Sequence, residues 1–218
     1  MMIVLCDIMT LLVYVSDSII DMTGQYVRMS GMNDSANIRR SHIVGAARPV
    51  FLRYGFGRTT MADIAQASGL TRPTLYLTFP DKESVFQAVV EATVEEKIAQ
   101  IRTGISDLPT VEEKLLYACN AWAVEGYELM QAHPDARDMF DLGFKAVCTG
   151  YQVFENQLVD ILRIAVDRSA LDLSPESIAR SIVYALKGFK DIATDSADLR
   201  TLIATHLAIV GAALVKEP

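Results

Sequence analysis

Apolar residues recur at helical spacing from Ser41 onward, and this first stripe stops just before a glycine. The members of the stripe are Ile43, Val44, Ala46, Ala47, Val50, Phe51 and Tyr54. Gly55 follows directly, where a helix commonly ends in a glycine. Pro49 lies inside the stripe and removes one backbone hydrogen bond. The pattern therefore predicts a helix over 41–54 with a kink at Pro49.

Three helix starts follow closely along the chain. Thr60 with Asp63 three residues later has the form of a capping box. Thr71 precedes a first turn that contains Pro73, where the missing N–H of proline costs nothing. Asp81 is suited to begin a third helix. The segment therefore predicts two short helices followed by a long one.

The two short helices are joined by a tight turn at Ser68-Gly69, where glycine allows a positive φ. Ala65 is small where the helix axes must approach each other. One side of the pair is apolar (Ile64, Leu70 and Leu75), and the other presents hydrogen-bonding side chains (Arg72, Thr74, Tyr76 and Thr78). Two helices around a glycine turn form a helix-turn-helix, whose second helix enters the DNA major groove.

The rest of the chain is also patterned as helices, and no strand-like alternation or repeat is visible. Helices are expected over about 82–104, 110–131, 136–149, 151–168, 175–192 and 198–215. We therefore expect an all-α protein, with an N-terminal three-helix bundle that contains the helix-turn-helix and a C-terminal helical domain. The expected divisions are an extension over 1–32, a DNA-binding domain over 33–82 and a regulatory domain over 83–218.

The first 32 residues are apolar, but the uninterrupted stretch Ile8–Val15 is too short for a membrane span, which needs about 20 residues. No basic residue precedes Arg28, which argues against a secretory signal. Two interpretations remain open. The segment is an extra helix packed on the body, or translation begins at Met29 or Met32, which is the favoured alternative. Neither involves a membrane.

Charge is distributed unevenly along the 218 residues, whose net charge is −7. Residues 33–83 hold seven basic and four acidic side chains, whereas residues 84–218 hold twelve basic and twenty acidic ones. A basic block in an acidic protein favours an anionic partner, and DNA phosphates are the commonest one. A mildly basic solvated surface is the alternative.

The cysteines and histidines give no sign of catalytic or metal chemistry. Cys6, Cys119 and Cys148 form no CxxC pair, and His42, His133 and His206 are far apart in the sequence. A reducing, cytoplasmic location follows, with no metal, no cofactor and no catalytic residue expected. We expect Cys119 and Cys148 to be small buried side chains. A redox sensor formed by these two cysteines is the weaker alternative.

The segment from Arg39 to Val90 resembles the N-terminal DNA-binding domain of the TetR family of bacterial transcriptional repressors. Its hallmarks occur in order: Ala46-Ala47, Phe51, Gly55, Thr59-Thr60, Asp63-Ile64-Ala65, Gly69, Thr74-Leu75-Tyr76, Phe79 and Lys82-Glu83. The resemblance covers about a quarter of the chain. Pro49 and the apolar stretch ahead of Arg39 depart from the family pattern.

The resemblance implies DNA contacts at named positions. Arg39 and Arg40 would approach the DNA backbone or minor groove from an arm or first turn, and Thr59 and Thr60 would bind a phosphate at a helix start. The recognition helix would be lined by Thr71, Arg72, Pro73, Thr74, Tyr76 and Thr78, with Tyr76 and Lys82 clamping phosphates. Arg72 is the best candidate to read a guanine.

The last two predicted helices are unusually apolar, with Ile178, Ile182, Leu186, Leu202, Leu207 and Val210 among their residues. Some of these side chains must form internal core. In TetR-like repressors the last two long helices pair with their copies, so a homodimer is expected. Palindromic half-sites, which a helix-turn-helix dimer reads by two-fold symmetry, agree with this.

The middle helices are rich in aromatic residues, which are typical of both packed cores and apolar ligand pockets. Trp122, Tyr127, Phe144 and Tyr151 are the candidate ligand contacts. Nearby acidic residues (Glu125, Glu128, Asp138 and Asp141) could favour a cationic ligand, although a solvated face explains them better.

The combined expectation is a homodimeric transcriptional regulator that acts as a repressor. It binds a palindromic double-stranded DNA operator and is released by a small, mostly apolar molecule. Two other classes are weighed against it. One is a helical adaptor that binds protein and not DNA. The other is an enzyme with a DNA-binding head, which is disfavoured because no nucleophile–base pair or phosphate-binding glycine loop is visible.

Overall fold

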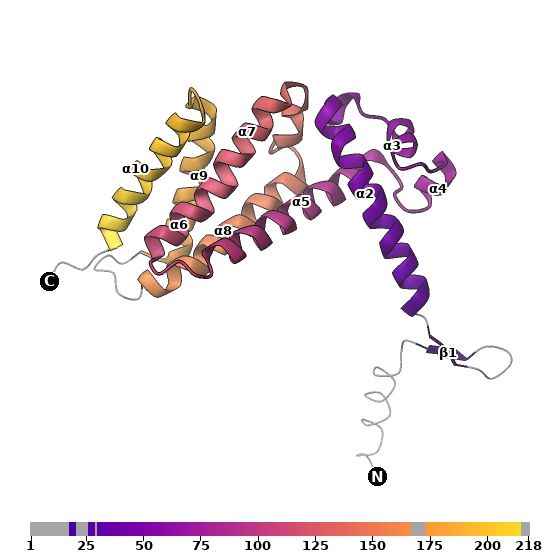
Figure 1. Cartoon of the computed structure of the whole chain (residues 1–218), viewed down its shortest axis with the longest axis horizontal. Helices are drawn as coiled ribbons and strands as arrows, with labels where there is room; N and C mark the ends of the chain where they lie inside the picture. Colours follow the sequence, from indigo (N-terminus) through magenta and orange to yellow (C-terminus); the bar gives the residue numbers. More distant parts are fainter. Residues whose placement is uncertain (1–17, 21–25, 29, 167–172, 215–218) are drawn as a thin grey trace, which may run out of the picture.

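The structure is a computed structural model that describes residues 18–20, 26–28, 30–166 and 173–214 (Figure 1). Helices make up the body: α2 (Ser30–Arg58), α3 (Met61–Ala67), α4 (Arg72–Tyr76), α5 (Lys82–Ile105), α6 (Val111–Cys119), the π-helix η1 (Asn120–Val124), α7 (Glu125–Ala132), the 3₁₀ helix η2 (Pro134–Phe140), α8 (Lys145–Val166), α9 (Pro175–Ile192) and α10 (Ser196–Leu214). The all-α expectation is confirmed.

A short antiparallel hairpin precedes the helices, and the sequence pattern did not predict it. Strand β1 (Ser18–Ile20) pairs with β2 (Tyr26–Arg28), with Ile19 opposite Val27. Three-residue strands are too short to show alternation of polar and apolar positions. The apolar stretch Ile8–Val15 lies outside the described residues. None of the described helices is long and apolar enough to cross a membrane.

Helix α2 is longer than predicted. It begins at Ser30 rather than Ser41, and residues 35–42 are exposed, so no apolar stripe marks this part of the helix. The helix continues through Pro49, and non-helical dihedral angles occur at Gly55 instead (φ 73°, ψ 169°). Pro49 therefore does not break the helix, a kink there stays a prediction, and the predicted helix end at Gly55 agrees with these angles.

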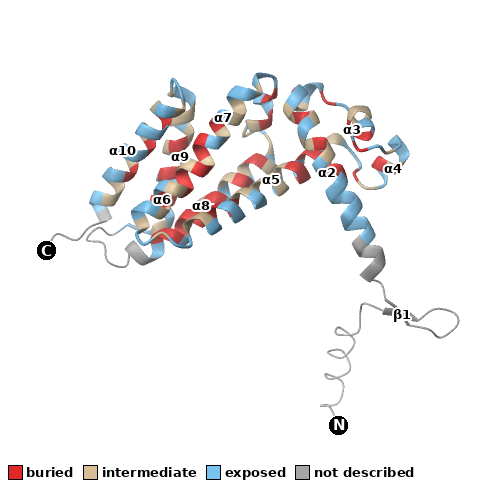
Figure 2. Cartoon of the chain, in the orientation of Figure 1, coloured by how far each residue is buried: buried red, intermediate tan, exposed pale blue. Residues whose placement is uncertain are grey.

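Two hydrophobic cores divide the body, and α5 contributes to both of them (Figure 2). The first core lies under the helix-turn-helix and contains the fully buried Phe51, Phe79 and Phe86. The second core joins α6–α10 and includes Leu158 and Ile182. Since one helix runs through both cores, α5 joins the two parts directly. The exact division at residue 82 stays a prediction.

Gly150 lies within one long helix, although the sequence suggested a break beside it. Helix α8 runs from Lys145 through Gly150 to Val166, so the two predicted helices over 136–149 and 151–168 are wrong. A Cβ atom at position 150 would lie 2.9 Å from a methyl group of Val94. The glycine therefore serves the close approach of α5 and α8, and not a turn.

Candidate nucleic-acid interface and ligand cavity

The helix-turn-helix is built by side-chain caps at both helix starts. The Thr60 hydroxyl accepts from the Asp63 amide, and the Asp63 carboxylate accepts from the Thr60 amide. Thr71 caps α4 through the Thr74 amide, and Pro73 lies in the first turn. Gly69 between the helices has φ 64°, a conformation that favours glycine. The caps and turn predicted from the sequence are confirmed.

Packing fixes the crossing of α3 and α4 from one side. Ile64 and Leu75 are fully buried and Ala65 is 3% exposed, while Leu70 is half-buried. Ala65 lets the helices approach closely, because any larger side chain would separate them. The apolar side expected from the sequence is therefore the buried side.

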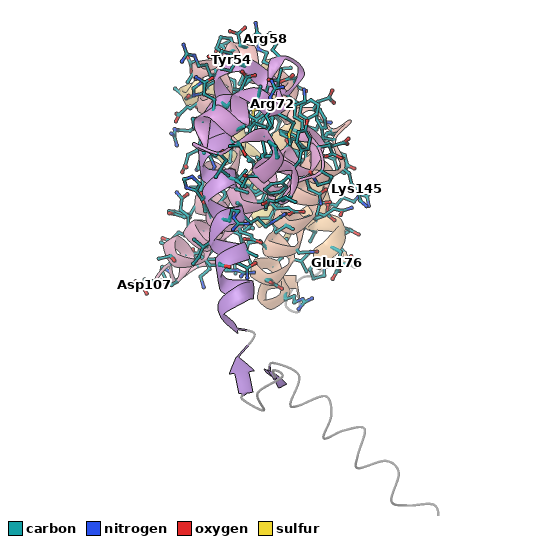
Figure 3. The ribbon with its side chains drawn as sticks, turned by 90° about the vertical axis from the view of Figure 1, so that its right-hand side faces the viewer. Tyr54, Arg58, Arg72, Asp107, Lys145 and Glu176 are labelled. Carbon is teal, nitrogen blue, oxygen red and sulfur yellow. The ribbon has the colours of Figure 1, made fainter. Side chains whose placement is uncertain are left out.

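The opposite side of α4 faces outward. Thr71, Arg72 and Pro73 are exposed and Tyr76 is 50% exposed, whereas Thr74 and Thr78 are half-buried. Figure 3 shows Arg72 in the upper part of the view, below Tyr54 and Arg58. The Thr71 and Thr74 hydroxyls are 2.8 Å apart and share a hydrogen bond. The arrangement leaves guanidinium, hydroxyl and phenol groups accessible on one short helix.

Charges near the turn are arranged to keep the capping carboxylate ionised. Hydrogen bonds from the Thr60 hydroxyl and amide lower the pKa of Asp63, and the nearby Arg72 guanidinium lowers that pKa further. No ion pair within the described residues holds Arg72. Its guanidinium is therefore available for a phosphate or a base edge.

The arginines at the N-terminal side lie on a helix and not on an arm. Arg39 and Arg40 are exposed residues of α2. The Arg40 guanidinium stacks over the Phe79 ring, 4.4 Å from its centroid. Arg40 is therefore oriented by a cation–π contact next to the loop that follows α4.

Thr59 and Lys82 have internal partners in place of the expected outward positions. Thr59 is 1% exposed, and its hydroxyl donates to the Gly55 carbonyl at 2.7 Å. The Lys82 ammonium donates to the Phe56 carbonyl at 2.6 Å and lies over the Phe56 ring. Both side chains stabilise the turn between α2 and α3, which corrects the expectation that Thr59 presents its hydroxyl to DNA.

The 3₁₀ helix η2 holds the same turn from the side of the C-terminal helical body. The Asp138 carboxylate accepts from the amides of Phe56 (3.0 Å) and Gly57 (2.7 Å). Asp135 pairs with Arg58 at 2.8 Å. A Cβ atom at Gly55 would lie 2.5 Å from the Asp135 carbonyl oxygen. This contact joins the helix-turn-helix head (α2, α3 and α4) to the rest of the chain, immediately before α3.

A cavity of about 480 Å³ lies between the head and the helical body. Its apolar walls come from α2, α5, η1, α7, η2 and α8, and include Leu52, Val89, Val90, Val94, Trp122, Leu129, Met139, Phe140 and Val147. This volume is within the range of about 300–1,000 Å³ that small-molecule sites occupy. Since η2 supplies both Met139 and Asp138, the cavity adjoins the contact that holds the head.

Trp122 and Tyr151 line the cavity, whereas the two other expected ligand contacts do not. Tyr127 is 5% exposed, and its hydroxyl donates to the Ala193 carbonyl at 3.2 Å. The Phe144 ring packs against Phe56, with centroids 4.6 Å apart. Tyr127 and Phe144 are thus core residues in this structure. Helical spacing shows that Tyr127 and Phe144 face inward, but it does not show which inward-facing residues line a cavity.

Trp122 lies on a π-helical turn that the sequence did not reveal. The turn η1 interrupts the continuous run from α6 to α7. The indole stacks on Phe154, with centroids 4.4 Å apart and planes at 3°. Such turns insert one residue into a helix and occur frequently at functional sites.

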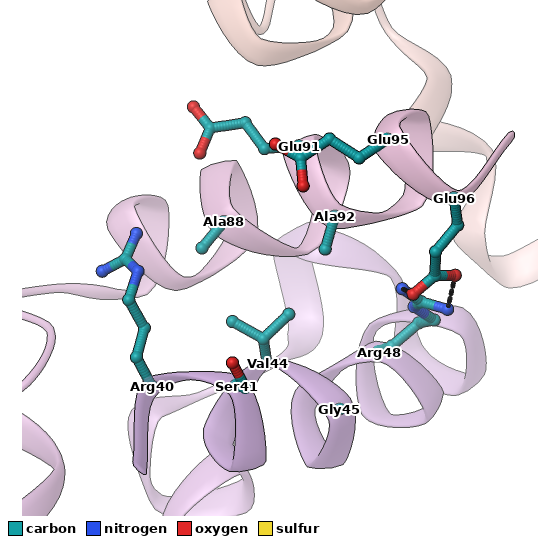
Figure 4. Close-up of a pocket in the computed structure, with 10 residues that line it drawn as sticks. All are labelled: Arg40, Ser41, Val44, Gly45, Arg48, Ala88, Glu91, Ala92, Glu95 and Glu96. Carbon is teal, nitrogen blue, oxygen red and sulfur yellow. Dashed lines mark hydrogen bonds and ion pairs between the residues drawn. The ribbon is translucent and has the colours of Figure 1, made fainter. Parts of the chain in front are cut away.

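Two ion pairs border the cavity. Arg48 of α2 binds both carboxylate oxygens of Glu96 on α5, at 2.7 and 2.8 Å. Lys97 pairs with Glu125 of α7. The hydrogen bond to Arg48 lowers the pKa of Glu96, so this carboxylate stays charged. The first pair also borders a second hollow of about 430 Å³ between α2 and α5, lined by Ser41 and Glu91 among others (Figure 4).

The acidic residues near the cavity already have partners. Glu125 binds Lys97, Glu128 approaches Arg200 at 3.5 Å, and Asp141 accepts from the Gly143 amide. Asp138 holds the head, as described above. The geometry therefore gives a cationic ligand no free carboxylate from this set.

Lys190 is a cavity residue that the sequence analysis missed. A signal was present, because Ile182, Leu186 and Lys190 follow at intervals of four residues, and the first two are buried. A lysine at the next position of a buried helical stripe must face inward or lie at the edge of the core.

Together these features define a helix-turn-helix protein with a helical body and a cavity between the two. A family model described as bacterial regulatory proteins of the tetR family matches residues 43–89. Over this segment the chain is similar to TetR-family regulators. The curated regulator TtgR of Pseudomonas putida is 37% identical over 62 residues, which cover 28% of this chain and 30% of TtgR. The matched residues span less than half of the length of the curated relatives.

Solved structures extend the similarity of fold beyond the head. A TetR-family regulator from Cytophaga hutchinsonii is similar over 84% of this chain and 98% of its own, with a TM-score of 0.65 and 20% identity. FadR from Bacillus subtilis, solved in complex with stearoyl-CoA, is similar over 79% of this chain and 98% of its own, with a TM-score of 0.57 and 18% identity. The helical body therefore has the fold of these regulators.

Proposed function

We propose that this protein is a transcriptional regulator, acting as a repressor, that binds a palindromic operator as a homodimer and is released by a small, mostly apolar effector. The observation that carries the proposal is the capped, outward-facing α4, with Arg72 free of any ion pair among the described residues. A helix of this kind enters the major groove, which is about 12 Å wide.

Release by an effector is supported by the position of the cavity. Arg48 and Leu52 of α2 line it together with residues of the body, so a bound molecule contacts both parts of the chain. A ligand that prefers one tilt of α5 shifts the population of head positions by its differential affinity for the two states. Coupling of about 1–3 kcal/mol changes operator affinity about 5–150-fold.

Dimerisation is supported by the outer face of α9 and α10, at the end of the body away from the head (Figure 1). Tyr184 and Ile209 are large apolar side chains that are 59% and 66% exposed. Small exposed residues (Ser181, Gly188, Ala204 and Ala208) adjoin them on the same two helices. This apolar face with small residues suits close packing against a second copy, which would present two α4 helices to successive grooves about 34–36 Å apart.

The test of DNA reading is Arg72→Ala. Operator affinity is expected to fall by about 1–3 kcal/mol, with relaxed preference at one base pair of each half-site. Selection from a random duplex library followed by fluorescence anisotropy at several salt concentrations measures both effects.

Arg163→Ala is the matched control, because Arg163 is exposed on α8, far along the chain from the helix-turn-helix. It should leave operator binding unchanged. Failure of the folded wild-type protein to bind any duplex at low salt would refute the proposed function and favour a protein-binding adaptor.

A further inference from the structure

One cation of the cavity has no acidic partner within the described residues. The lining contains three basic and two acidic side chains. Arg48 pairs with Glu96 and Lys97 with Glu125, whereas Lys190 forms no ion pair in that part of the chain. The lining therefore carries one uncompensated positive charge.

Tyr151 holds the Lys190 ammonium at the edge of the cavity. The Nζ atom donates to the Tyr151 hydroxyl oxygen at 2.9 Å and lies 5.3 Å from the ring centroid. Tyr151 in turn contacts Trp122 edge to face, with centroids 5.9 Å apart. Because the phenol oxygen accepts from Lys190, its own proton remains available to donate. Two donors thus converge at one place in the lining.

An ammonium group that is half-buried beside apolar walls favours an anion in the cavity. Removing a charge from water is costly unless an opposite charge and hydrogen bonds replace the lost hydration. Neither Glu96 nor Glu125 is available to Lys190, since each carboxylate is bound by another cation. The single uncompensated charge of Lys190 balances a ligand with one negative charge. It does not balance the two negative charges of a phosphate monoester.

We propose that the cavity selects a molecule with an apolar body and a single carboxylate, which binds the Lys190 ammonium and the Tyr151 hydroxyl. This proposal rests on the effector part of the proposed function and specifies the class of effector. The carboxylate accepts one hydrogen bond from each donor, and the apolar body contacts Val89, Val94 and Trp122. An alcohol of equal length forms the same apolar contacts without the charge-assisted hydrogen bond.

Trp122 provides a direct readout, because it is the protein's single tryptophan and lines the cavity. Decanoate, decanol and decyltrimethylammonium, which share one apolar chain, are titrated into the full-length protein while its fluorescence is followed. Decanoate is expected to bind about tenfold more tightly than decanol, and the cationic probe most weakly.

Lys190→Met should lower decanoate affinity about tenfold and leave decanol affinity unchanged. Lys190→Arg keeps the charge and should restore most of the preference for decanoate. Lys187→Met is the matched control, because this lysine lies one turn earlier on α9 and does not line the cavity. Thermal unfolding establishes that each variant is folded, and Lys190→Gln replaces Lys190→Met if the latter is not.

Equal affinity of the wild-type protein for decanoate and decanol would overturn the proposal. So would preference for the cationic probe, an unchanged decanoate affinity in Lys190→Met, or the absence of binding by all three probes. Operator binding is measured separately without any probe. Its failure would therefore count against the proposed function, while the fluorescence titration judges the ligand class alone.

Discussion

At the scale of single residues, conformation and burial decide what each group can do. Gly55 has a positive φ and lies against backbone of η2, Gly69 has a positive φ in open space, and Gly45 is helical and exposed. Comparing these positions distinguishes two reasons for a glycine that the sequence alone cannot tell apart. One is the backbone strain of a side chain at positive φ, and the other is steric exclusion by a neighbour.

Substitution of the three glycines by alanine should give graded effects on the free energy of unfolding. Gly69→Ala is expected to cost about 1–2 kcal/mol from strain alone. Gly55→Ala should cost more, about 2–4 kcal/mol, because strain and the clash with the Asp135 carbonyl act together. Gly45→Ala should stabilise by about 0.5–1 kcal/mol. Urea unfolding measures the order, and equal costs for Gly55→Ala and Gly69→Ala would contradict the steric part.

Cys119 is expected to be chemically inert in the folded protein. The residue is fully buried, and burial raises the pKa of its thiol to about 12, so the reactive thiolate is scarce at neutral pH. Cys148 is half-buried, and its thiol donates to the Leu142 carbonyl. Iodoacetamide labelling read by peptide mass mapping should modify Cys148 well before Cys119. A Cys119–Cys148 disulfide formed under mild oxidation of the folded protein would instead favour a redox sensor.

At the scale of elements, η2 connects the cavity to the head. Its Asp138 caps the Phe56 and Gly57 amides, while its Met139 and Phe140 line the cavity. The Arg48–Glu96 pair makes a second connection between α2 and α5. A molecule in the cavity therefore adjoins both links, which gives a physical route by which occupancy could reposition α3 and α4.

Asp138→Ala should destabilise the protein by about 1–3 kcal/mol, because two backbone amides lose a charged acceptor. Asp138→Asn keeps one acceptor oxygen and is expected to give an intermediate loss. Asp107→Ala, at an exposed residue after α5, should change stability by less than about 0.5 kcal/mol. The midpoint of thermal unfolding measures all three. A loss for Asp138→Ala no larger than that of the control would show that η2 does not hold the head.

At the scale of the whole molecule, the head and the outer face of α9 and α10 lie at opposite ends of an elongated body. Two copies joined through that face would hold their heads apart, as a palindromic site requires. The cavity lies between these ends, so under the proposed function a change at its walls would alter the spacing of the two heads.

The double substitution Tyr184→Glu with Ile209→Glu should convert the proposed dimer to a monomer, because it buries two charges in an apolar interface. Analytical ultracentrifugation measures the mass, and operator affinity should fall with it. Leu77→Glu is the control for the mass measurement alone, since Leu77 is 83% exposed at the end of α4, away from α9 and α10. A doubly substituted protein that still sediments as a dimer would refute this interface.

The helix-turn-helix could be predicted from the sequence, because its caps, turn and apolar side depend on residues that are close together in the chain. The Thr60–Asp63 and Thr71 caps, the glycines with positive φ and the apolar side of α3 and α4 all follow from spacing over a few residues. The helix expected over 175–192 begins at Pro175, where Ser174 provides the cap. The all-helical class followed from the recurrence of apolar residues at helical spacing along the chain.

Contacts between distant segments were decided only by the tertiary structure. Gly150 suggested a break, yet the approach of Val94 from α5 makes it an interior helix position. Thr59 is turned inward by the Gly55 carbonyl, and Asp138 reaches amides 82 and 81 residues earlier. The cavity arises where seven helical elements leave space between them, so no single element's pattern reveals it. Helical periodicity tells which side of each helix is buried, whereas long-range packing decides what that side meets.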